Sequence, residues 1–279
     1  MTMDTEIIYR IANWNLERPL KQSKKLDLAL QKIQTINPDI CILTETSNLV
    51  DLGNSYCASK TDEYEDFPNE QWATIWSKYP ITEEIQTFDS CKATCALIQA
   101  PFGKIIVYAT IIPYHNSGVR DGGQYLYAPR TYKAWEMHKE DIQHQGQDWL
   151  RISAEYPDIP LCIAGDFNQT RDEQKRGYGT IDGRNLLTVA LNNSNLVCIT
   201  DEDFAGHGKL QPNPKTGVTR RNIDHICLST NWFNSLNNKY IGAWDHFTEE
   251  GVFMTDHNGV YFDFAIDPTL THKKVPTPK

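Results

Sequence analysis

Apolar residues occur along the chain in short runs separated by polar turns, a pattern that predicts many strands and a few amphipathic helices. Residues 7–16 form the first predicted strand, and Asn13, Asn15 and Glu17 occupy alternate positions at its end. Side chains two positions apart in a strand lie on the same face. We therefore expect Asn15 and Glu17 to reach the same ion.

A helix is predicted after this strand, because Pro19 can open a helix and apolar residues recur at positions 26, 30 and 33. Asn37 and Pro38 end the helical pattern. Residues 39–44 follow as a second strand, with Glu45 at its end. The chain is therefore expected to begin with a strand-helix-strand unit that delivers acidic residues to one rim.

The remaining pattern is rich in strands. Further strands are expected at residues 72–77, 94–99, 104–112, 161–164, 197–200, 223–228, 240–243 and 260–265, and helices at residues 130–156 and 184–196. Residues 51–71, 116–128 and 206–219 are expected to be loops. This mixture indicates an α/β or α+β architecture.

The length of 279 residues and the hydrophobic content of 40% suit one large domain, which we assign to residues 1–266. Residues 267–279 contain three prolines and three lysines with little to bury, and they are expected to form a flexible tail. The first residues lack the apolar region of a secretory signal, and the longest apolar stretch is too short to span a bilayer. We therefore expect a soluble, cytoplasmic protein without a membrane span.

The formal net charge is −9, so no overall positive field attracts a polyanion such as duplex DNA. A nuclease is still compatible with this charge, because a metal ion and a few local arginines can supply positive charge where a phosphate binds. The seven cysteines are odd in number, and several fall in apolar strand-like runs. They are expected to be reduced and buried, without disulfide partners.

Polar residues at the ends of the apolar runs suggest one chemistry. Hydrolysis of a phosphate ester needs a cation, an oriented water and a group that stabilises developing negative charge. Glu17 and Glu45 are hard oxygen ligands of the kind that hold Mg²⁺ or Mn²⁺. Asp166 and Asn168 share one face of an extended segment, so that one can orient or deprotonate water while the other holds phosphate.

A histidine and a carboxylate could complete such a site. His257 can donate a hydrogen bond to a phosphoryl oxygen, and a carboxylate such as Asp224 would fix its tautomer and raise its pKa. A salt bridge between Asp224 and Arg220 or Arg221 is the competing structural interpretation.

In their order along the chain, these motifs resemble the endonuclease/exonuclease/phosphatase superfamily, which includes DNase I-like nucleases, abasic-site endonucleases, inositol polyphosphate phosphatases and neutral sphingomyelinases. The strongest matches are GDFN at residues 165–168 and DH at residues 256–257, supported by WNL at 14–16, LTET around Glu45 and IDHI around Asp224. The resemblance extends from Trp14 to about Phe264, nearly the whole chain.

The resemblance implies a four-layer α/β-sandwich of the α+β class, with two packed, mostly antiparallel sheets flanked by helices and the site at one end. The roles that it implies are metal binding for Glu45, Asn15, Glu17 and Asp256, activation of water by Asp166, contact with phosphate or positioning of Asp166 by Asn168, and orientation of His257 by Asp224.

The sequence departs from the family pattern at one position. Family members usually have a His or Tyr in the strand equivalent to residues 105–113, where this chain has Ile111. Tyr114 and His115, just beyond the strand, are the candidate replacements. The further candidates for contact with substrate phosphate are Arg130, Arg220 and Arg221.

The sequence thus favours a phosphoesterase that depends on Mg²⁺ or Mn²⁺ and hydrolyses phosphodiester bonds, with nucleic acid as the first substrate class. Such an enzyme is a nuclease, and the sequence leaves endonuclease and exonuclease action open. One alternative is a phosphatase or phosphodiesterase that acts on a small phosphate ester or phospholipid head group. Another is a catalytically silent binding protein on the same fold, because the fold is reused for many functions.

Overall fold

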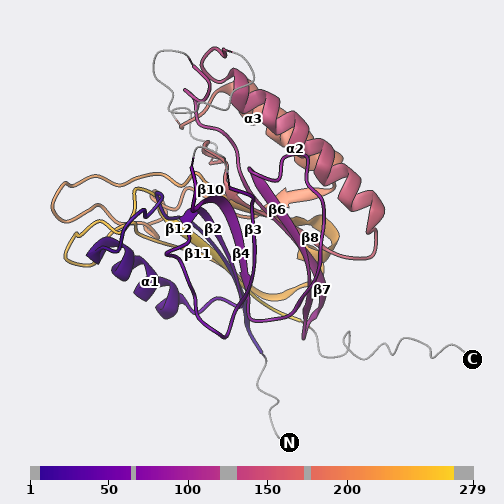
Figure 1. Ribbon diagram of the computed structural model, residues 1–279, viewed down its shortest axis with the longest axis horizontal. Coiled ribbons are helices and arrows are strands. Elements are labelled where there is room, and N and C mark those ends of the chain that lie inside the picture. Colours follow the sequence, from indigo (N-terminus) through magenta and orange to yellow (C-terminus); the bar gives the residue numbers. More distant parts are fainter. Residues whose placement is uncertain (1–6, 64–66, 120–130, 173–176, 267–279) are drawn as a thin grey trace, which may run out of the picture.

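Two six-stranded sheets dominate the computed structural model, which describes residues 7–63, 67–119, 131–172 and 177–266 (Figure 1). The strands of these ranges are β1 (Tyr9–Asn15), β2 (Ile40–Ser47), β3 (Cys57–Lys60), β4 (Glu70–Ser77), β5 (Ile81–Glu84), β6 (Ala93–Ala100), β7 (Gly103–Ile111), β8 (Leu161–Asp166), β9 (Leu196–Cys198), β10 (Asp224–Ser229), β11 (Asn237–Trp244) and β12 (Gly259–Ala265). The helices are α1 (Lys24–Ile36), α2 (Glu136–Glu155), α3 (Ile181–Asn193) and α4 (Thr230–Ser235).

The first sheet has the strand order β11-β12-β1-β2-β4-β3, and the second has the order β5-β6-β7-β8-β10-β9. Strands β1 and β2 are parallel, as are β7 and β8, and the other paired strands are antiparallel. Both sheets are therefore mixed but mostly antiparallel. The predicted architecture of two such sheets flanked by helices is confirmed.

Three apolar layers hold the sandwich together. Between the sheets, Ile11 and Ile42 of the first sheet belong to the same buried cluster as Ile105 and Ala164 of the second. Helix α1 covers the outer face of the first sheet, and α2 and α3 lie side by side over the outer face of the second (Figure 1). These three helices bury apolar side chains against the two sheets, so the molecule has four layers.

The first helix begins later than its sequence pattern predicts. Ser23 is its N-cap, and the Ser23 side chain accepts a hydrogen bond from the backbone N–H of Leu26 (3.2 Å). Asn37, in the left-handed conformation with φ of 50°, ends the helix before Pro38. Residues 19–23 therefore connect β1 to the helix and do not belong to it.

The sequence analysis missed β3, β5 and α4. Strands β3 and β5 are edge strands, and most of their residues are exposed, so neither contains an apolar run that a periodicity argument could detect. All seven cysteines are free thiols, as expected, but two of them are not buried: Cys57 is exposed and Cys91 is half-buried. Among the described helices, none has the length and apolar character that crossing a membrane requires. The predicted tail at residues 267–279 lies outside the described ranges.

Candidate active site

The candidate residues meet at one end of the sandwich because several strands end or begin there. Asn15 ends β1, Glu45 lies near the end of β2, and Asp166 ends β8. Asp224 begins β10, which runs antiparallel to β8, so that Asp224 pairs directly with Asp166. The segment before β12 brings His257 to the same end, because β12 runs antiparallel to β1.

A close approach of backbone to backbone fixes the position of Asp166. Gly165 has a positive φ of 155°, and a Cβ atom there would lie only 1.7 Å from the carbonyl oxygen of Thr110. Only glycine therefore allows β8 to lie against β7 at this point. In the same place, Asn13 donates hydrogen bonds to the carbonyl oxygens of Gly165 (3.0 Å) and His225 (3.3 Å), which joins the two sheets.

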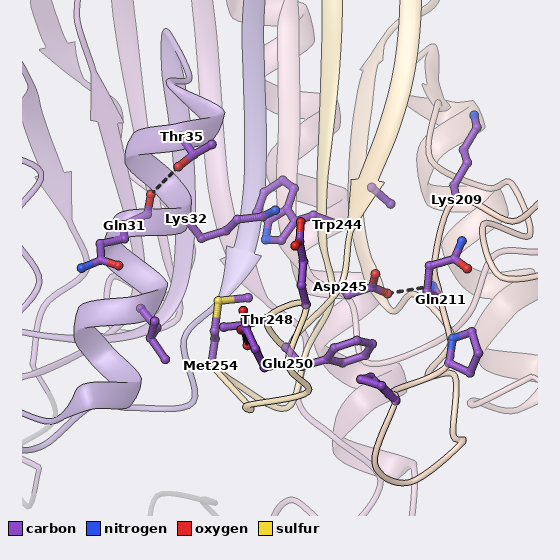
Figure 2. Close-up of a pocket in the computed structure, with 16 residues that line it drawn as sticks. Gln31, Lys32, Thr35, Lys209, Gln211, Trp244, Asp245, Thr248, Glu250 and Met254 are labelled. Atoms are coloured by element: carbon purple, nitrogen blue, oxygen red, sulfur yellow. Dashed lines mark hydrogen bonds between the residues drawn. The ribbon is translucent and has the colours of Figure 1, made fainter.

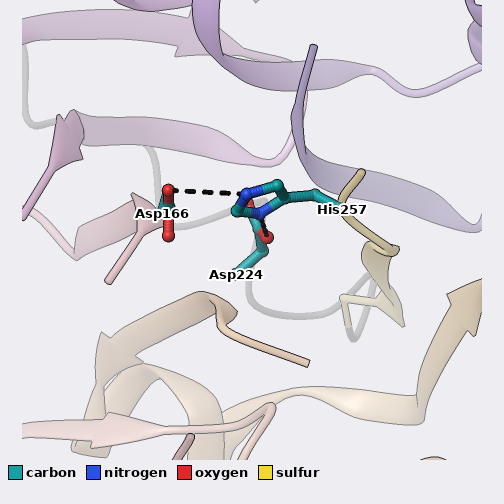
Figure 3. Close-up of side chains that lie close together, drawn as sticks. All are labelled: Asp166, Asp224 and His257. Carbon is teal, nitrogen blue, oxygen red and sulfur yellow. Dashed lines mark hydrogen bonds and ion pairs between the residues drawn. The ribbon is translucent and has the colours of Figure 1, made fainter. Parts of the chain in front are cut away.

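His257 and Asp224 form a hydrogen-bonded pair beside Asp166 (Figure 3). Nδ1 of His257 lies 2.7 Å from Oδ2 of Asp224, and Nε2 lies 4.0 Å from Oδ2 of Asp166 and 3.6 Å from Oδ1 of Asp256. Burial alone would lower the pKa of His257, but the Asp224 and Asp166 carboxylates raise it well above its usual value. These carboxylates favour the protonated imidazole, in which Nε2–H is a donor.

Asp166 is buried and is held by two asparagines. It accepts hydrogen bonds from Nδ2 of Asn15 (3.0 Å) and from Nδ2 (2.9 Å) and the backbone N–H (2.8 Å) of Asn168. Burial, together with the Asp224 and Glu45 carboxylates, raises the pKa of Asp166 well above its usual value, although His257 opposes this shift. A carboxylate with a raised pKa is a stronger base than one in water.

Asn168 also donates a hydrogen bond to the carbonyl oxygen of Ile112 (3.0 Å). Its amide hydrogens are therefore directed at Asp166 and at the backbone after β7. Of the two roles considered for Asn168, this geometry supports the positioning of Asp166.

Glu45 lies within β2 and not at its end. It has a positive φ of 47° and interrupts the regular pairing of β2 with β4, which brings its side chain to the site. Its carboxylate accepts a hydrogen bond from Nδ2 of Asn15 (3.2 Å) and pairs with Nε of Arg18 (3.0 Å). Arg18 was not among the predicted site residues, although it lies only two residues after the WNL motif at 14–16.

The structure does not bring Glu17 into the cluster. Strand β1 ends at Asn15, and Glu17 follows with a positive φ of 54°, so the alternation that would place both side chains on one face is lost. The Glu17 carboxylate instead pairs with Lys25 of α1. Asn15 Oδ1 accepts a hydrogen bond from the backbone N–H of Glu17 (2.8 Å).

A cavity of about 590 Å³ opens onto these residues. It is lined by Arg18, Glu45, Tyr114, Asp166, Asn168, Tyr178, Arg220, Arg221, Ile223, Asp256, His257 and Asn258. The cavity therefore contains both acidic residues and arginines, as a site for a phosphate ester and a cation requires.

Three of the predicted phosphate contacts, Tyr114, Arg220 and Arg221, line this cavity. His115 does not; its Nδ1 hydrogen-bonds the hydroxyl of Tyr178 (2.8 Å). Arg130 lies outside the described residues.

Arg220 and Arg221 lie next to carboxylates other than that of Asp224. Arg220 pairs with Asp256 (3.5 Å), and Nη1 of Arg221 lies 4.0 Å from Oδ2 of Asp172. Asp224 is instead hydrogen-bonded to His257, with Oδ2 2.7 Å from Nδ1.

Ile111 stands where the family pattern has a His or Tyr. It is buried and pairs with Asp166 between β7 and β8. Tyr114, one of its two candidate replacements, lines the cavity.

A larger cavity of about 730 Å³ lies elsewhere, between α1 and the segments around residues 209–214 and 243–254 (Figure 2). Lys32, Trp244, Asp245 and Glu250 are among the residues that line it. None of the residues predicted for the site lines it, so size alone does not locate the chemistry of this protein.

One group of described residues could present three ligand atoms within 4.8 Å of one another: Asp166, Asp224 and His257. Nδ1 of His257 is already hydrogen-bonded to Asp224, and an imidazole that is protonated on both nitrogens cannot ligate a cation. The carboxylates of Glu45 and Asp256, which line the same cavity, are better suited to a hard divalent cation.

A model of the Endonuclease/Exonuclease/phosphatase family matches residues 12–236. None of the curated proteins matches the chain significantly by sequence.

Similar solved structures include the endonuclease domain of TRAS1, a telomere-specific non-LTR retrotransposon, with 17% identity over 93% of this chain and 99% of that chain and a TM-score of 0.58. The catalytic domain of human Nocturnin with bound sulfate is 17% identical over 94% of this chain and 97% of its own, with a TM-score of 0.60. Truncated Caenorhabditis elegans TDP2 is 12% identical over 92% and 98%, with a TM-score of 0.57. At these identities the likenesses show a shared fold.

Proposed function

Because the chain belongs to the endonuclease/exonuclease/phosphatase family, we propose that it is a phosphoesterase that uses a divalent metal ion to hydrolyse phosphodiester bonds in nucleic acid. The observation that carries this proposal is the arrangement of His257, held by Asp224 at 2.7 Å, beside the buried Asp166 in one cavity. A donor and a base are thus placed next to each other.

In the proposed reaction, water attacks the phosphorus atom and gives its proton to Asp166, while the bond from phosphorus to the leaving oxygen breaks. Asn15 and Asn168 hold Asp166 in place for this role. The Nε2–H of His257 donates to a non-bridging oxygen, where negative charge develops. Asp224 keeps the imidazole protonated and oriented.

The position of Arg221 supports the proposal that a phosphate binds in this cavity. Its Nη1 atom is buried and makes no hydrogen bond to any described residue, and the Asp172 carboxylate is 4.0 Å away. The guanidinium adds positive charge to the cavity wall, and a guanidinium can pair with a phosphate.

The site fits Mg²⁺ or Mn²⁺, because Glu45 and Asp256 bring oxygen donors to the cavity wall. Each Glu45 oxygen contacts one donor, Asn15 or Arg18, and an ionised carboxylate oxygen can accept more than one. A bound ion would supply positive charge to the non-bridging oxygens of the substrate. Asn15 positions Glu45 in this scheme.

Hydrolysis of bis-p-nitrophenyl phosphate and of a single-stranded oligonucleotide tests the proposal, with Mg²⁺ or Mn²⁺ and after treatment with EDTA. We expect metal-dependent turnover that falls by roughly 10²- to 10⁴-fold in Asp166→Ala and His257→Ala. Glu45→Gln should raise the concentration of metal needed for half-maximal activity.

The exposed His207, which pairs with Glu202 away from the cavity, provides a matched control, and His207→Ala should retain wild-type turnover. If the wild-type protein is no faster than Asp166→Ala and His257→Ala, the silent binding protein replaces the enzyme as the better interpretation.

A further inference from the structure

The cavity has two chemically different parts. One contains the charged residues of the proposed reaction. The other is formed by Tyr114, Tyr178 and Ile223, which no step of that reaction uses. We refer to the rings of Tyr114 and Tyr178 as the aromatic wall.

The backbone of Tyr178 is fixed next to the reacting residues. Its carbonyl oxygen accepts hydrogen bonds from the backbone N–H (2.9 Å) and the hydroxyl (3.2 Å) of Thr170, which lies shortly after Asp166 in sequence. The flanking glycines permit this arrangement. A Cβ at Gly177 would lie 1.9 Å from the Thr170 hydroxyl, and Gly179 has a φ of 107°.

The Tyr178 side chain is held as well. Its hydroxyl lies 2.8 Å from Nδ1 of His115, and its ring packs edge-on against Trp135 with the centroids 5.2 Å apart. The residue nevertheless remains 37% exposed. A ring that is fixed from several sides and still exposed is a pre-organised surface, because little side-chain entropy is lost when a planar group binds to it.

The charged groups beside the wall are already paired with carboxylates. Arg18 pairs with Glu45, Arg220 with Asp256 and His257 with Asp224, and Nη1 of Arg221 lies 4.0 Å from Asp172. These groups offer few unpaired charges, so we look to the uncharged aromatic wall for further contacts with a substrate.

On the premise that the proposed function is correct, we infer that the aromatic wall binds an unpaired base of the substrate, with the adjacent phosphate against His257 and Arg221. Aromatic side chains stack on bases of any sequence, whereas a base inside a duplex is paired and stacked on its neighbours. The cavity of about 590 Å³ is within the range of small-ligand sites and suits one nucleotide unit. The substrate is therefore a nucleotide in single-stranded nucleic acid.

Calorimetric binding of adenosine 5′-monophosphate and ribose 5-phosphate, with Ca²⁺ in place of Mg²⁺, tests this inference, because the two compounds differ only by the base. The wild-type protein should bind the nucleotide roughly 5- to 150-fold more tightly than the sugar phosphate. Tyr178→Leu should abolish most of this preference, whereas Tyr178→Phe, which keeps the ring, should retain most of it. Tyr240→Leu removes a half-exposed tyrosine that does not line the cavity and should retain all of it.

Equal affinity of the wild-type protein for the two compounds, or no binding of the nucleotide, overturns the inference. The same conclusion follows if Tyr178→Leu folds normally by circular dichroism and keeps the full preference. These outcomes are independent of hydrolysis. If the protein prefers the nucleotide but cleaves no phosphodiester, the proposed function is contradicted, whereas binding of a base by the aromatic wall is supported.

Discussion

The side-chain amide of Asn13 on β1 donates a hydrogen bond to the carbonyl oxygen of Gly165 on β8, at 3.0 Å. The bond connects the two sheets directly below the candidate site. Asn13 lies two residues before Asn15, and Gly165 immediately precedes Asp166. The hydrogen bond between Asn13 and Gly165 therefore helps to set the separation of Asn15 and Asp166, whose side chains are hydrogen-bonded at 3.0 Å.

Asn13→Ala should lower the free energy of unfolding by about 1 to 3 kcal/mol, because it removes the two buried hydrogen bonds to the carbonyl oxygens of Gly165 and His225. Urea denaturation measures this loss. The exposed Asn234 provides the control, since Asn234→Ala should change stability by less than about 0.5 kcal/mol. Equal effects of the two substitutions would show that the bond between the sheets contributes nothing.

Gly165→Ala should destabilise the fold by about 2 kcal/mol or more, because the added Cβ would lie 1.7 Å from the Thr110 carbonyl oxygen. Gly53→Ala is the matched control. Gly53 also has a positive φ, of 87°, but a Cβ there meets nothing within 4 Å. The difference between their unfolding free energies in urea isolates the steric contribution, and a difference near zero contradicts the close approach of β7 and β8.

Asp224→Asn should narrow the pH range of activity. Asp224 raises the pKa of His257, so its neutralisation should lower that pKa. Because the proposed reaction needs the protonated imidazole, the alkaline limb of the kcat/KM profile should move to lower pH, with a fall in the maximum of roughly 10- to 100-fold. An unchanged alkaline limb would mean that the ionisation of His257 does not control this limb.

His138 should make the fold sensitive to mild acid. It is buried, its Nδ1 lies 2.7 Å from the carbonyl oxygen of Pro113, and burial lowers its pKa below the usual 6.5. The unfolded state therefore binds the proton more readily, and the stability that neutral His138 contributes is present above pH 6.5 and declines as the pH falls below it.

Unfolding free energies at pH 7 and pH 5 test this linkage. The decrease over that interval should be smaller in His138→Asn, whose amide can donate to the same carbonyl oxygen, than in the wild-type protein. His207→Ala controls for the loss of an exposed histidine. If the decrease is the same in His138→Asn and the wild-type protein, another group dominates the acid response.

The main architecture could be read from the sequence because its signals are local. Strand β8 is an apolar run that ends in Asp166, and α1 has the apolar spacing of an amphipathic helix, so each element is defined within about ten residues. The edge strand β5 has mostly exposed residues and gives no such signal. These candidate site residues could likewise be recognised from the sequence, because Asp166, Asp224 and His257 fall in short motifs next to strands.

The positions of Glu17, Arg18 and Tyr178 required the tertiary structure. Glu17 was expected beside Asn15 because the alternation of the predicted strand, residues 7–16, was extended to residue 17. Strand β1 ends at Asn15, and the backbone turns the Glu17 carboxylate towards Lys25. Arg18 reaches Glu45 only because β1 and β2 are parallel neighbours.

By itself, the sequence determined most of the elements and the chemical groups near their ends, because these depend on spacing between neighbours. Only the tertiary structure decided which of those groups meet. The contact of Asp224 with His257 joins residues 33 positions apart, and that of Asn15 with Asp166 joins residues 151 apart. Such contacts depend on strand order, on register and on the packing of two sheets, and no local pattern of residues encodes these directly.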